Sequence, residues 1–256
     1  MDCDIFLSDW TIEMEHFLDT VETIGPGLGF SLFSPLHLLW LVIFLLTTLI
    51  CCHFYQRSQR QDVWRKWMAG LLLADELFKH VCLLAGGNFL LKYLPLHLCS
   101  INIFLIALHA WKPQRLLGHF LYLVCIPASI AALLFPTWSS LPPCNFMHIH
   151  SFTVHILLAS IPIILTAVGE IKPSIKYLPG CLAILLGGGA IALVFNLIFD
   201  TNFMFLMSAP KGSPLYWFAE NTPSHLIGFP VIIAGILIVM LTPFEVVRRI
   251  KNKKTA

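Results

Sequence analysis

The sequence predicts an all-α polytopic membrane protein built as a helical bundle. Of its 256 residues, 57% are hydrophobic and only 12% are charged, whereas a soluble domain carries about 25% charged residues. The apolar residues gather into seven runs, each close to the length of about 20 residues with which a helix crosses a bilayer. We therefore expect one compact transmembrane domain and no separate soluble domain.

The first 34 residues form an acidic segment that precedes the first apolar run. This segment lacks the basic stretch that opens a secretory signal peptide. Its apolar residues recur at roughly helical spacing, at Trp10, Met14, Phe17, Leu18 and Val21. The spacing favours an amphipathic helix on the extracytoplasmic membrane surface, and a solvated leader is the alternative.

The membrane domain is predicted over residues 35–244. Its seven expected spans are 35–55, 64–86, 95–111, 116–135, 148–169, 177–199 and 223–244. We expect the third span to begin at Pro95, because proline suits the first turn of a helix. Pro162 and Pro230 fall inside the fifth and seventh spans, where proline tends to kink a helix.

The orientation is predicted from lysine and arginine in the connecting segments. Thirteen of them fall in the tail and in the segments after the first, third and fifth spans, and two, Lys92 and Lys211, fall on the opposite side. The N-terminus is therefore predicted outside, and residues 245–256 are predicted to form a basic cytoplasmic tail. An odd number of spans agrees with this orientation.

Polar and ionisable side chains within the predicted spans gather in one half of the membrane. With the orientation above, nine of them fall at the membrane centre or on its outer side. They are His37, Glu76, Lys79, His80, His97, Cys99, Asn102, His155 and Asn196. Such groups are costly in lipid and usually mark a functional cavity. The sequence therefore predicts a polar pocket that opens outward.

The densest cluster is Leu94-Pro-Leu-His-Leu-Cys-Ser100, at the predicted start of the third span. A helix N-terminus favours negative charge and hence the thiolate of Cys99, and His97 nearby acts in the same direction. These features favour Cys99 as a nucleophile, although a small packing residue is the alternative. Asn102 is a candidate for stabilising an oxyanion.

His155, in the fifth span, is the candidate partner from another helix. It lies about 10 Å along the helix from His148, by the usual rise per residue, and the seven-residue spacing puts both on one face. His155 and His97 enter the bundle from the same side at comparable depth, so we expect them to face each other across a cavity.

Five further histidines lie near the ends of spans. Water or lipid headgroups are expected to solvate them there. They are His53, His109, His119, His148 and His150.

Glu76 in the second span has basic neighbours at the spacing of ion pairs on a helix. Lys79 and His80 follow it by three and four residues. An internal pair that neutralises itself is the favoured interpretation, and a carboxylate that orients a catalytic histidine is the alternative.

Two asparagines fall at the end of the sixth span. Asn196 is expected to hydrogen-bond between helices. Asn202 comes shortly before a turn-rich segment, residues 207–215, which is a candidate cap for the pocket.

The run Leu94-Pro-Leu-His-Leu-Cys99, together with Thr201-Asn-Phe-Met-Phe-Leu206 and Pro210, resembles the YwaF-like integral membrane proteins of bacteria. Glu76 and His155 also match positions of that family, and the resemblance covers residues 34–245. The family is similar to the eukaryotic transmembrane protein 164 group. The resemblance implies a phospholipid acyltransferase that uses a cysteine and a histidine.

The carry-over from that group is partial. Pro95 and His97 resemble the proline and histidine of its Pro-Cys-His motif, and His155 with Pro162 resembles its second histidine segment. Leu96 stands here where the group has cysteine. The nearest cysteine is Cys99, three residues later and nearly one helical turn on.

The leading hypothesis is an acyltransferase or acyl hydrolase of the bacterial plasma membrane. Cys99 would be its nucleophile and His155 or His97 its general base. The predicted supporting residues of the pocket are Glu76, His80, Asn102, Asn196 and Asn202. The substrates would be membrane phospholipids, with a lipid as acyl donor, no cofactor and no nucleic-acid partner.

Two alternatives remain open. A zinc-dependent lipid hydrolase would hold its metal with three histidines, or with two and Glu76, but the last span carries only His225 and the eight cysteines form no CxxC pair. The other alternative is a non-enzymatic protein that binds or transports a lipid or small molecule.

Overall fold

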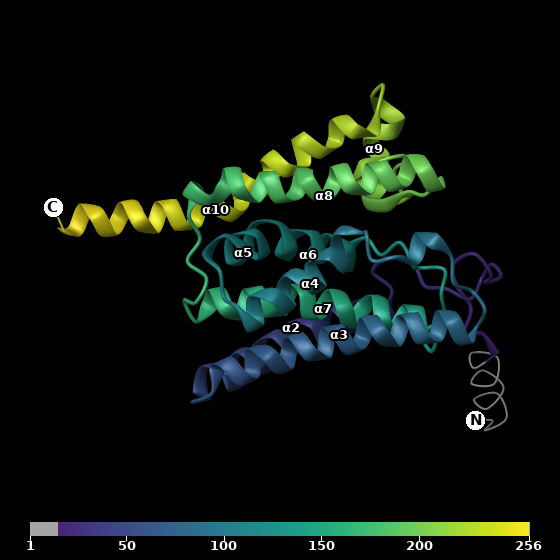
Figure 1. Ribbon diagram of the computed structural model, residues 1–256, viewed down its shortest axis with the longest axis horizontal. Helices are drawn as coiled ribbons and strands as arrows, with labels where there is room; N and C mark the ends of the chain where they lie inside the picture. The colour runs from purple at the N-terminus through teal and green to yellow at the C-terminus, as the bar shows by residue number, and fades with distance from the viewer. Residues whose placement is uncertain (1–14, 256) are drawn as a thin grey trace.

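The computed structural model describes the backbone of residues 15–255 and the side chains of residues 15–242. Over that range the chain forms helices and turns and no β-strand, so the all-α prediction is confirmed. Figure 1 shows the long helices running roughly parallel and antiparallel to one another.

The elements, in chain order, are α2 (Pro35–Arg57), α3 (Gln61–Ala85), the 3₁₀ turn η1 (Leu91–Tyr93), α4 (Leu98–Trp111), α5 (Arg115–Phe120), the π-helical segment η2 (Leu121–Cys125), α6 (Ile126–Leu134), α7 (Phe146–Ala167), η3 (Ile175–Tyr177), α8 (Leu178–Phe199), η4 (Phe203–Phe205), α9 (Pro214–Asn221), η5 (His225–Ile227) and α10 (Gly228–Thr255).

The helices fall into two groups. The core bundle comprises α2 to α7, and the outer layer comprises α8 to α10 together with the segments that join them (Figure 1). The helix α7 is the centre of the core bundle, because α2, α3, α4 and α6 all pack against it. The outer layer meets the core mainly where α8 lies on α5 and α10 lies on η2.

Side-chain caps fix where two core helices begin. Ser34 precedes Pro35 of α2, and its hydroxyl accepts the N–H of His37. The side-chain oxygen of Asn145 accepts the N–H groups of Met147 and His148 at the start of α7, at 2.9 and 3.2 Å. Such caps satisfy N–H groups that have no partner within the helix.

Proline residues account for two local features of the core. Pro162 lies inside α7 and cannot donate to the carbonyl of Leu158. The Cys125 thiol donates to that carbonyl instead, at 3.3 Å. Pro127 follows the π-helical segment directly, where the wider turn makes room for a ring without an N–H.

The structure refines one predicted position of proline and corrects another. Pro230 lies inside the His225–Thr242 span, as predicted, but in the first turn of α10, where the missing N–H has no acceptor within the helix. Pro95 does not begin the third helix, because Leu94 and His97 are extended and the N–H of Leu96 bonds the carbonyl of Leu94 at 2.8 Å. The helix begins at Leu98.

Within the part of the chain that the structure describes, six helical segments are long and apolar enough to cross a membrane: Pro35–Arg57, Leu91–Trp111, Arg115–Leu134, Phe146–Ala167, Ile175–Phe199 and His225–Thr242. The chain is therefore a multi-pass membrane protein. The helix α3 also has sufficient length, at 25 residues, but Asp75, Glu76 and Lys79 interrupt its apolar run. The seven-span count and the sides of the two termini stay predictions.

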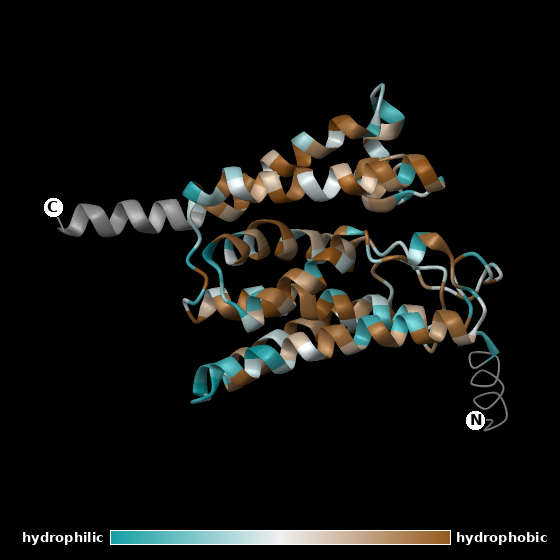
Figure 2. Ribbon diagram, in the orientation of Figure 1, coloured by the Kyte–Doolittle hydropathy of each residue, from teal (hydrophilic) through white to brown (hydrophobic). Residues whose placement is uncertain are grey.

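The two ends of the chain lie partly outside the description. Of the expected amphipathic helix, Trp10 and Met14 lie outside the described residues, and residues 16–34 run as turns. The helix α10 continues through the predicted basic tail as far as Thr255. Hydrophilic residues gather at the end of the core bundle where α2 passes into α3 (Figure 2).

Candidate functional site

Cys99 and His155 meet where the start of α4 faces α7. Cys99 is the second residue of α4, and the Nε2 atom of His155 lies 3.1 Å from its Sγ atom. Cys99 is half-buried, and His155 is 7% exposed. A thiol at this distance from an imidazole nitrogen is in direct hydrogen-bond contact, which is the geometry of a nucleophile and its base.

The orientation of the His155 ring is fixed by its other nitrogen. The Nδ1 atom lies 2.6 Å from the carbonyl oxygen of Ser151, one turn earlier in α7. A carbonyl only accepts, so Nδ1 carries the proton and Nε2 presents its lone pair to Cys99. The indole of Trp138 stacks on the imidazole with ring centres 5.2 Å apart, which restricts rotation of the ring.

Two polar side chains beside this pair have no partner among the described residues. Asn102 follows Cys99 by one turn on α4, is fully buried, and leaves both side-chain atoms unpaired. The Nε1 atom of Trp138 is also buried and unpaired. Buried polar groups are nearly always hydrogen-bonded in native proteins, so these three atoms are candidates for contact with a ligand group.

Backbone donors add to this set. His97 is the N-cap of α4 but gives no side-chain cap. The first intrahelical bond of the helix runs from the N–H of Ile101 to the carbonyl of His97. The N–H groups of Leu98, Cys99 and Ser100 therefore precede the hydrogen-bonded ladder and lie next to the thiol.

His97 does not approach Cys99 in the way that His155 does. Its Nδ1 atom accepts the N–H of Met204 at 3.3 Å, and its ring packs against Phe203 and Phe205. The two stretches that carry the family resemblance are therefore in contact, one at the start of α4 and the other after α8. His97 joins the core bundle to the outer layer.

Asn196 holds the segment that reaches His97. Its side chain bonds both the N–H and the carbonyl of Phe203, at 2.7 and 3.1 Å, and accepts from the hydroxyl of Thr201. Met204 and Phe205 have positive φ angles of 55° and 57°, which are uncommon for residues with side chains. Asn196 thus bonds within its own layer, not between helices as predicted.

Asn202 fixes the following turn. Its amide accepts the N–H groups of Met207 and Ser208 and donates to the Ser208 carbonyl and hydroxyl. These bonds close the segment that joins α8 to α9. A role of that segment as a cap over the pocket stays a prediction.

A buried charge cluster lies between α3 and α7. Glu76 pairs with Lys79 at 2.6 Å, as the favoured interpretation of the sequence has it. His150 lies 3.2 Å from Asp75 and 3.7 Å from Glu76. Glu76 therefore does not bond His155, so no contact supports the alternative in which Glu76 orients a catalytic histidine.

The cluster nonetheless adjoins the thiol and its histidine. Lys79 interacts electrostatically with Cys99 and His97, and Asp75 interacts with His155. His80 turns away, with its Nδ1 atom on the backbone carbonyl of Glu76 at 2.9 Å. The charged side chains of α3 thus make most of their contacts within the bundle.

The predicted solvation is wrong for four of the five histidines near the ends of spans. His53 is exposed, and the other four are buried, namely His148, His150, His109 and His119. The Nε2 atom of His148 accepts the indole N–H of Trp40 at 3.0 Å, and its Nδ1 atom donates to the Leu141 carbonyl. Trp40 comes from a distant segment, so no local pattern in the sequence shows this contact.

Sequence reasoning missed Asp75, Thr153 and Trp138. The hydroxyl of Thr153 lies 3.2 Å from both carboxylate oxygens of Asp75, and the position of Asp75 in an apolar run was a usable signal. Trp138 comes from the segment between α6 and α7, where a single aromatic residue carries no pattern.

Among the residues whose side chains are described, no three His, Cys, Asp or Glu side chains converge as a metal site would require. Two surface cavities lie at the far end of α4 and along α3, and a pocket over Cys99 stays a prediction. The zinc alternative gains no support from this geometry.

The sequence model of the TMEM164 family matches residues 32–241. The match takes in both Cys99 and His155 and the whole Thr201–Leu206 stretch. No curated protein and no solved structure matches the chain.

Proposed function

The chain belongs to the TMEM164 family of integral membrane proteins, and from that premise and the contact between Cys99 and His155 we propose that it is a thiol-dependent acyltransferase or acyl hydrolase of membrane phospholipids. The observation that carries the proposal is the distance of 3.1 Å between the His155 Nε2 and Cys99 Sγ atoms, with Nε2 left as the acceptor by the bond from Nδ1 to Ser151.

The reaction would begin when the thiol proton of Cys99 passes to Nε2 of His155 and the sulfur attacks the carbonyl carbon of a lipid ester. The tetrahedral intermediate then expels the alcohol of the donor lipid, which takes the proton back from Nε2. A thioester on Cys99 remains. An acceptor alcohol then gives its proton to Nε2 and attacks the thioester carbon; the C–S bond breaks and the Cys99 sulfur takes the proton back, which leaves the acyl group on a second lipid. Water in place of the alcohol gives hydrolysis.

The groups around the thiol suit the charge that this reaction creates. The intermediate carries a negative oxygen, which preorganised donors stabilise. The unpaired Asn102 carboxamide, the Trp138 N–H and the N–H groups that open α4 are such donors.

His97 has a positioning role in this proposal, and His155 is the base. The Nδ1 atom of His97 is engaged by the Met204 N–H, and its ring lies between Phe203 and Phe205, so it holds the α8–α9 segment against the start of α4. Apolar side chains at this junction would contact the acyl chains of the substrate.

The topology that fits this function has α3 as a seventh span. The helix packs along α7 and would extend about 37 Å at the usual rise per residue, more than a bilayer core. Its charged side chains Asp75, Glu76 and Lys79 pair with each other and with His150 inside the bundle, so they are not exposed to lipid as unpaired charges. The N-terminus would then lie outside a bacterial plasma membrane, with Cys99 toward the outer leaflet.

The test is the labelling rate of Cys99 by a thiol-reactive lipid analogue in the purified protein reconstituted in lipid. Cys52 is a matched control thiol, since it is also half-buried on a span. We expect Cys99 to react at least about tenfold faster than Cys52, as activated thiols do. The substitution His155→Gln should abolish that difference, whereas His80→Gln should preserve it.

Acyl transfer from a labelled phospholipid provides the second readout. Cys99→Ala and His155→Gln should each lower turnover about a hundredfold or more, with little change in thermal stability. Full turnover by Cys99→Ala would contradict the proposal. Equal labelling rates of Cys99 and Cys52 would also contradict the proposal and would favour a non-enzymatic, lipid-binding function for this chain.

A further inference from the structure

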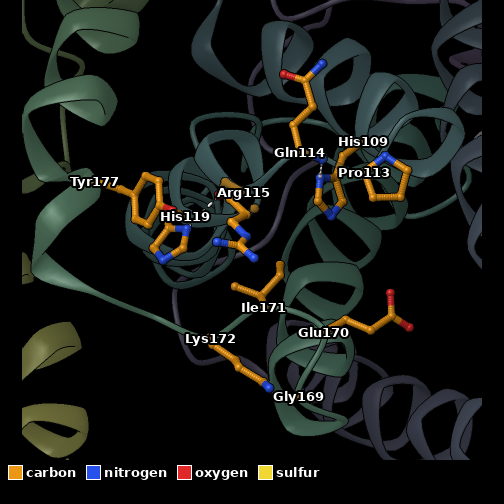
Figure 3. A pocket seen from close by; sticks show the side chains of 11 residues that line it. His109, Pro113, Gln114, Arg115, His119, Gly169, Glu170, Ile171, Lys172 and Tyr177 are labelled. Atoms are coloured by element: carbon orange, nitrogen blue, oxygen red, sulfur yellow. Dashed lines mark hydrogen bonds between the residues drawn. The ribbon is translucent and has the colours of Figure 1, made fainter.

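A second site lies at the other end of α4. A cavity of about 520 Å³ opens where the α4–α5 connection meets the segment between α7 and α8 (Figure 3). This volume is typical of small-ligand sites. Cys99 and His109 stand ten residues apart on α4, or about 15 Å along the axis, so the cavity is separate from the thiol.

The cavity carries positive charge without a matching negative charge. Arg115 and Lys172 line it, and neither forms an ion pair with any residue whose side chain is described. The one acidic residue on its wall is Glu170, which Arg65 engages at 2.7 Å and Tyr55 also bonds. Two cations are therefore left facing the open space.

A buried histidine on the same wall has an unused nitrogen. His119 is 5% exposed, donates from Nδ1 to the Arg115 carbonyl at 2.6 Å, and stacks on Tyr177 with ring centres 4.1 Å apart. Its Nε2 atom has no hydrogen-bond partner among the described residues. Because Nδ1 donates to a carbonyl, Nε2 presents a lone pair, which can accept the hydroxyl proton of a singly protonated phosphate group beside Arg115.

The walls of the cavity are fixed by local contacts. His109 accepts the N–H of Gln114 through its Nδ1 atom. A Cβ atom at Gly118 would come within 3.2 Å of Ile171 and 3.3 Å of His109, so glycine is what lets these two side chains close the site. The cavity is thus built by one end of the core bundle together with the segment that joins α7 to α8.

We propose that this cavity binds the phosphate group of a phosphate ester. Arginine offers a planar fork of donors that matches phosphate oxygens, and lysine adds a mobile point charge. Tyr177 and Ile171 supply an apolar wall for the remainder of the ligand. The phosphate could belong to an anionic lipid headgroup of the adjacent leaflet or to a soluble phosphate ester. The proposal does not depend on the acyl-transfer reaction.

The test compares two ligands and two pairs of substitutions in the full chain, purified in a detergent without phosphate. Phosphatidic acid is titrated against diacylglycerol, which has the same tails and no phosphate, and binding is followed by native mass spectrometry. Glycerol phosphate is titrated separately by calorimetry. The variant Arg115→Gln/Lys172→Gln is matched by Lys112→Gln/Lys176→Gln, which removes the same charge from exposed positions of the same two connections.

We expect phosphatidic acid to bind in preference to diacylglycerol, and Arg115→Gln/Lys172→Gln to weaken that binding at least about tenfold. The matched variant should bind as the wild type does. The same pattern for glycerol phosphate, without a preference between the lipids, would identify a soluble ligand. Equal weakening by both variants, or no binding of either phosphate compound, would overturn the proposal.

His119→Phe examines the unused nitrogen directly. Phenylalanine keeps the stack on Tyr177 but has no nitrogen to hydrogen-bond the ligand, so binding of whichever phosphate compound is active should fall. The thermal midpoint of the unliganded variant reports whether the fold survives. A folded His119→Phe variant with unchanged binding, alongside a weakened Arg115→Gln/Lys172→Gln variant, would remove His119 from the site and leave the two cations in it.

Discussion

The helix α7 at the centre of the core bundle and the outer layer invert the usual relation between apolar character and burial, whereas α2 at the edge of the core bundle resembles the outer layer, with 11% of its span buried. The spans of α8 and α10 are the most apolar in the chain, yet only 11% and 6% of their residues are buried. The span of α7 is less apolar, and 72% of its residues are buried. Lipid provides the apolar environment for the outer layer, so its helices can be apolar on all sides.

The polar residues follow the same division. In the core bundle, α3, α4 and α7 place charged and polar side chains against one another, as in the contacts of Asp75 with His150 and of His155 with Cys99. Without a hydrophobic driving force between helices, association in lipid depends on packing and on such bonds. The core is therefore where polar chemistry and stability reside together.

The largest expected difference between the two regions is the effect of removing an apolar side chain. Phe152 is fully buried in α7 and stacks on Trp40 at 4.8 Å. Phe152→Ala should destabilise the protein by about 3 kcal/mol or more, because it leaves a cavity. Leu197 on α8 is 67% exposed, and Leu197→Ala should change stability by less than about 0.5 kcal/mol.

Chemical denaturation in mixed micelles would measure both values. A large loss from Leu197→Ala would mean that a partner covers this face of α8 and that lipid is not its only neighbour. A small loss from Phe152→Ala would mean that the core is packed more loosely than its burial indicates.

A smaller effect is expected at the junction of the two regions. Asn196→Leu removes three hydrogen bonds that hold the α8–α9 segment and leaves the backbone groups of Phe203 buried without partners. We expect a loss of about 2 kcal/mol. Because that segment donates to His97, the Cys99 labelling rate should fall as well.

Asn221→Leu is the matched control for this junction. Asn221 is exposed on α9 and bonds only the Trp217 carbonyl one turn back. It should affect stability and labelling little. If Asn196→Leu lowers stability and leaves labelling unchanged, the outer layer would be an independent unit that does not support the thiol site.

The spans could be predicted from the sequence because a helix that crosses lipid must be predominantly apolar over about 20 residues. The predicted 148–169 and 177–199 spans differ from α7 and α8 by at most two residues at each end. The predicted start of the third helix was wrong because the N–H of Leu96 bonds the carbonyl of Leu94. No side-chain pattern in the sequence indicates this backbone bond. The last helix starts later than predicted, since residues 225–227 form a 3₁₀ turn first.

The site could be predicted only in part. Cys99 and His155 could be identified as candidates because polar groups within apolar runs are costly in lipid and usually have a function. Which histidine faces the thiol depends on how α4 and α7 pack, and spacing along the chain does not contain that information. Trp138 stacks on His155 from a connecting segment, and its role follows only from three-dimensional contact.

The N-terminal segment offers a further test of the core as the anchoring region. The Asn145 side chain donates to the carbonyls of His16, Phe17 and Asp19 while it caps α7. Asn145→Ala should cost about 1–2 kcal/mol through the lost cap and should release residues 16–19, which limited proteolysis would detect. Unchanged proteolysis would show that other contacts hold the segment.

The smallest expected effect depends on pH and concerns Glu22. Burial alone would raise the pKa of this carboxyl, but hydrogen bonds from Lys92 and Tyr93 outweigh burial and lower that pKa below its ordinary value of 4.5. Because the pKa of Glu22 is lower in the folded state than in the unfolded state, its contribution to stability is complete above the unfolded pKa and is lost as the pH falls through the folded pKa.

The partners of Glu22 lie at the end of the core bundle, so the loss should loosen residues 19–24 and leave α8 to α10 unchanged. Thermal midpoints of wild type and Glu22→Gln should differ slightly at neutral pH, and the difference should shrink below about pH 4.5. A difference that persists in acid would mean that Glu22 acts through packing and not through its charge, and the ion pair with Lys92 would then contribute nothing to holding the segment on the core.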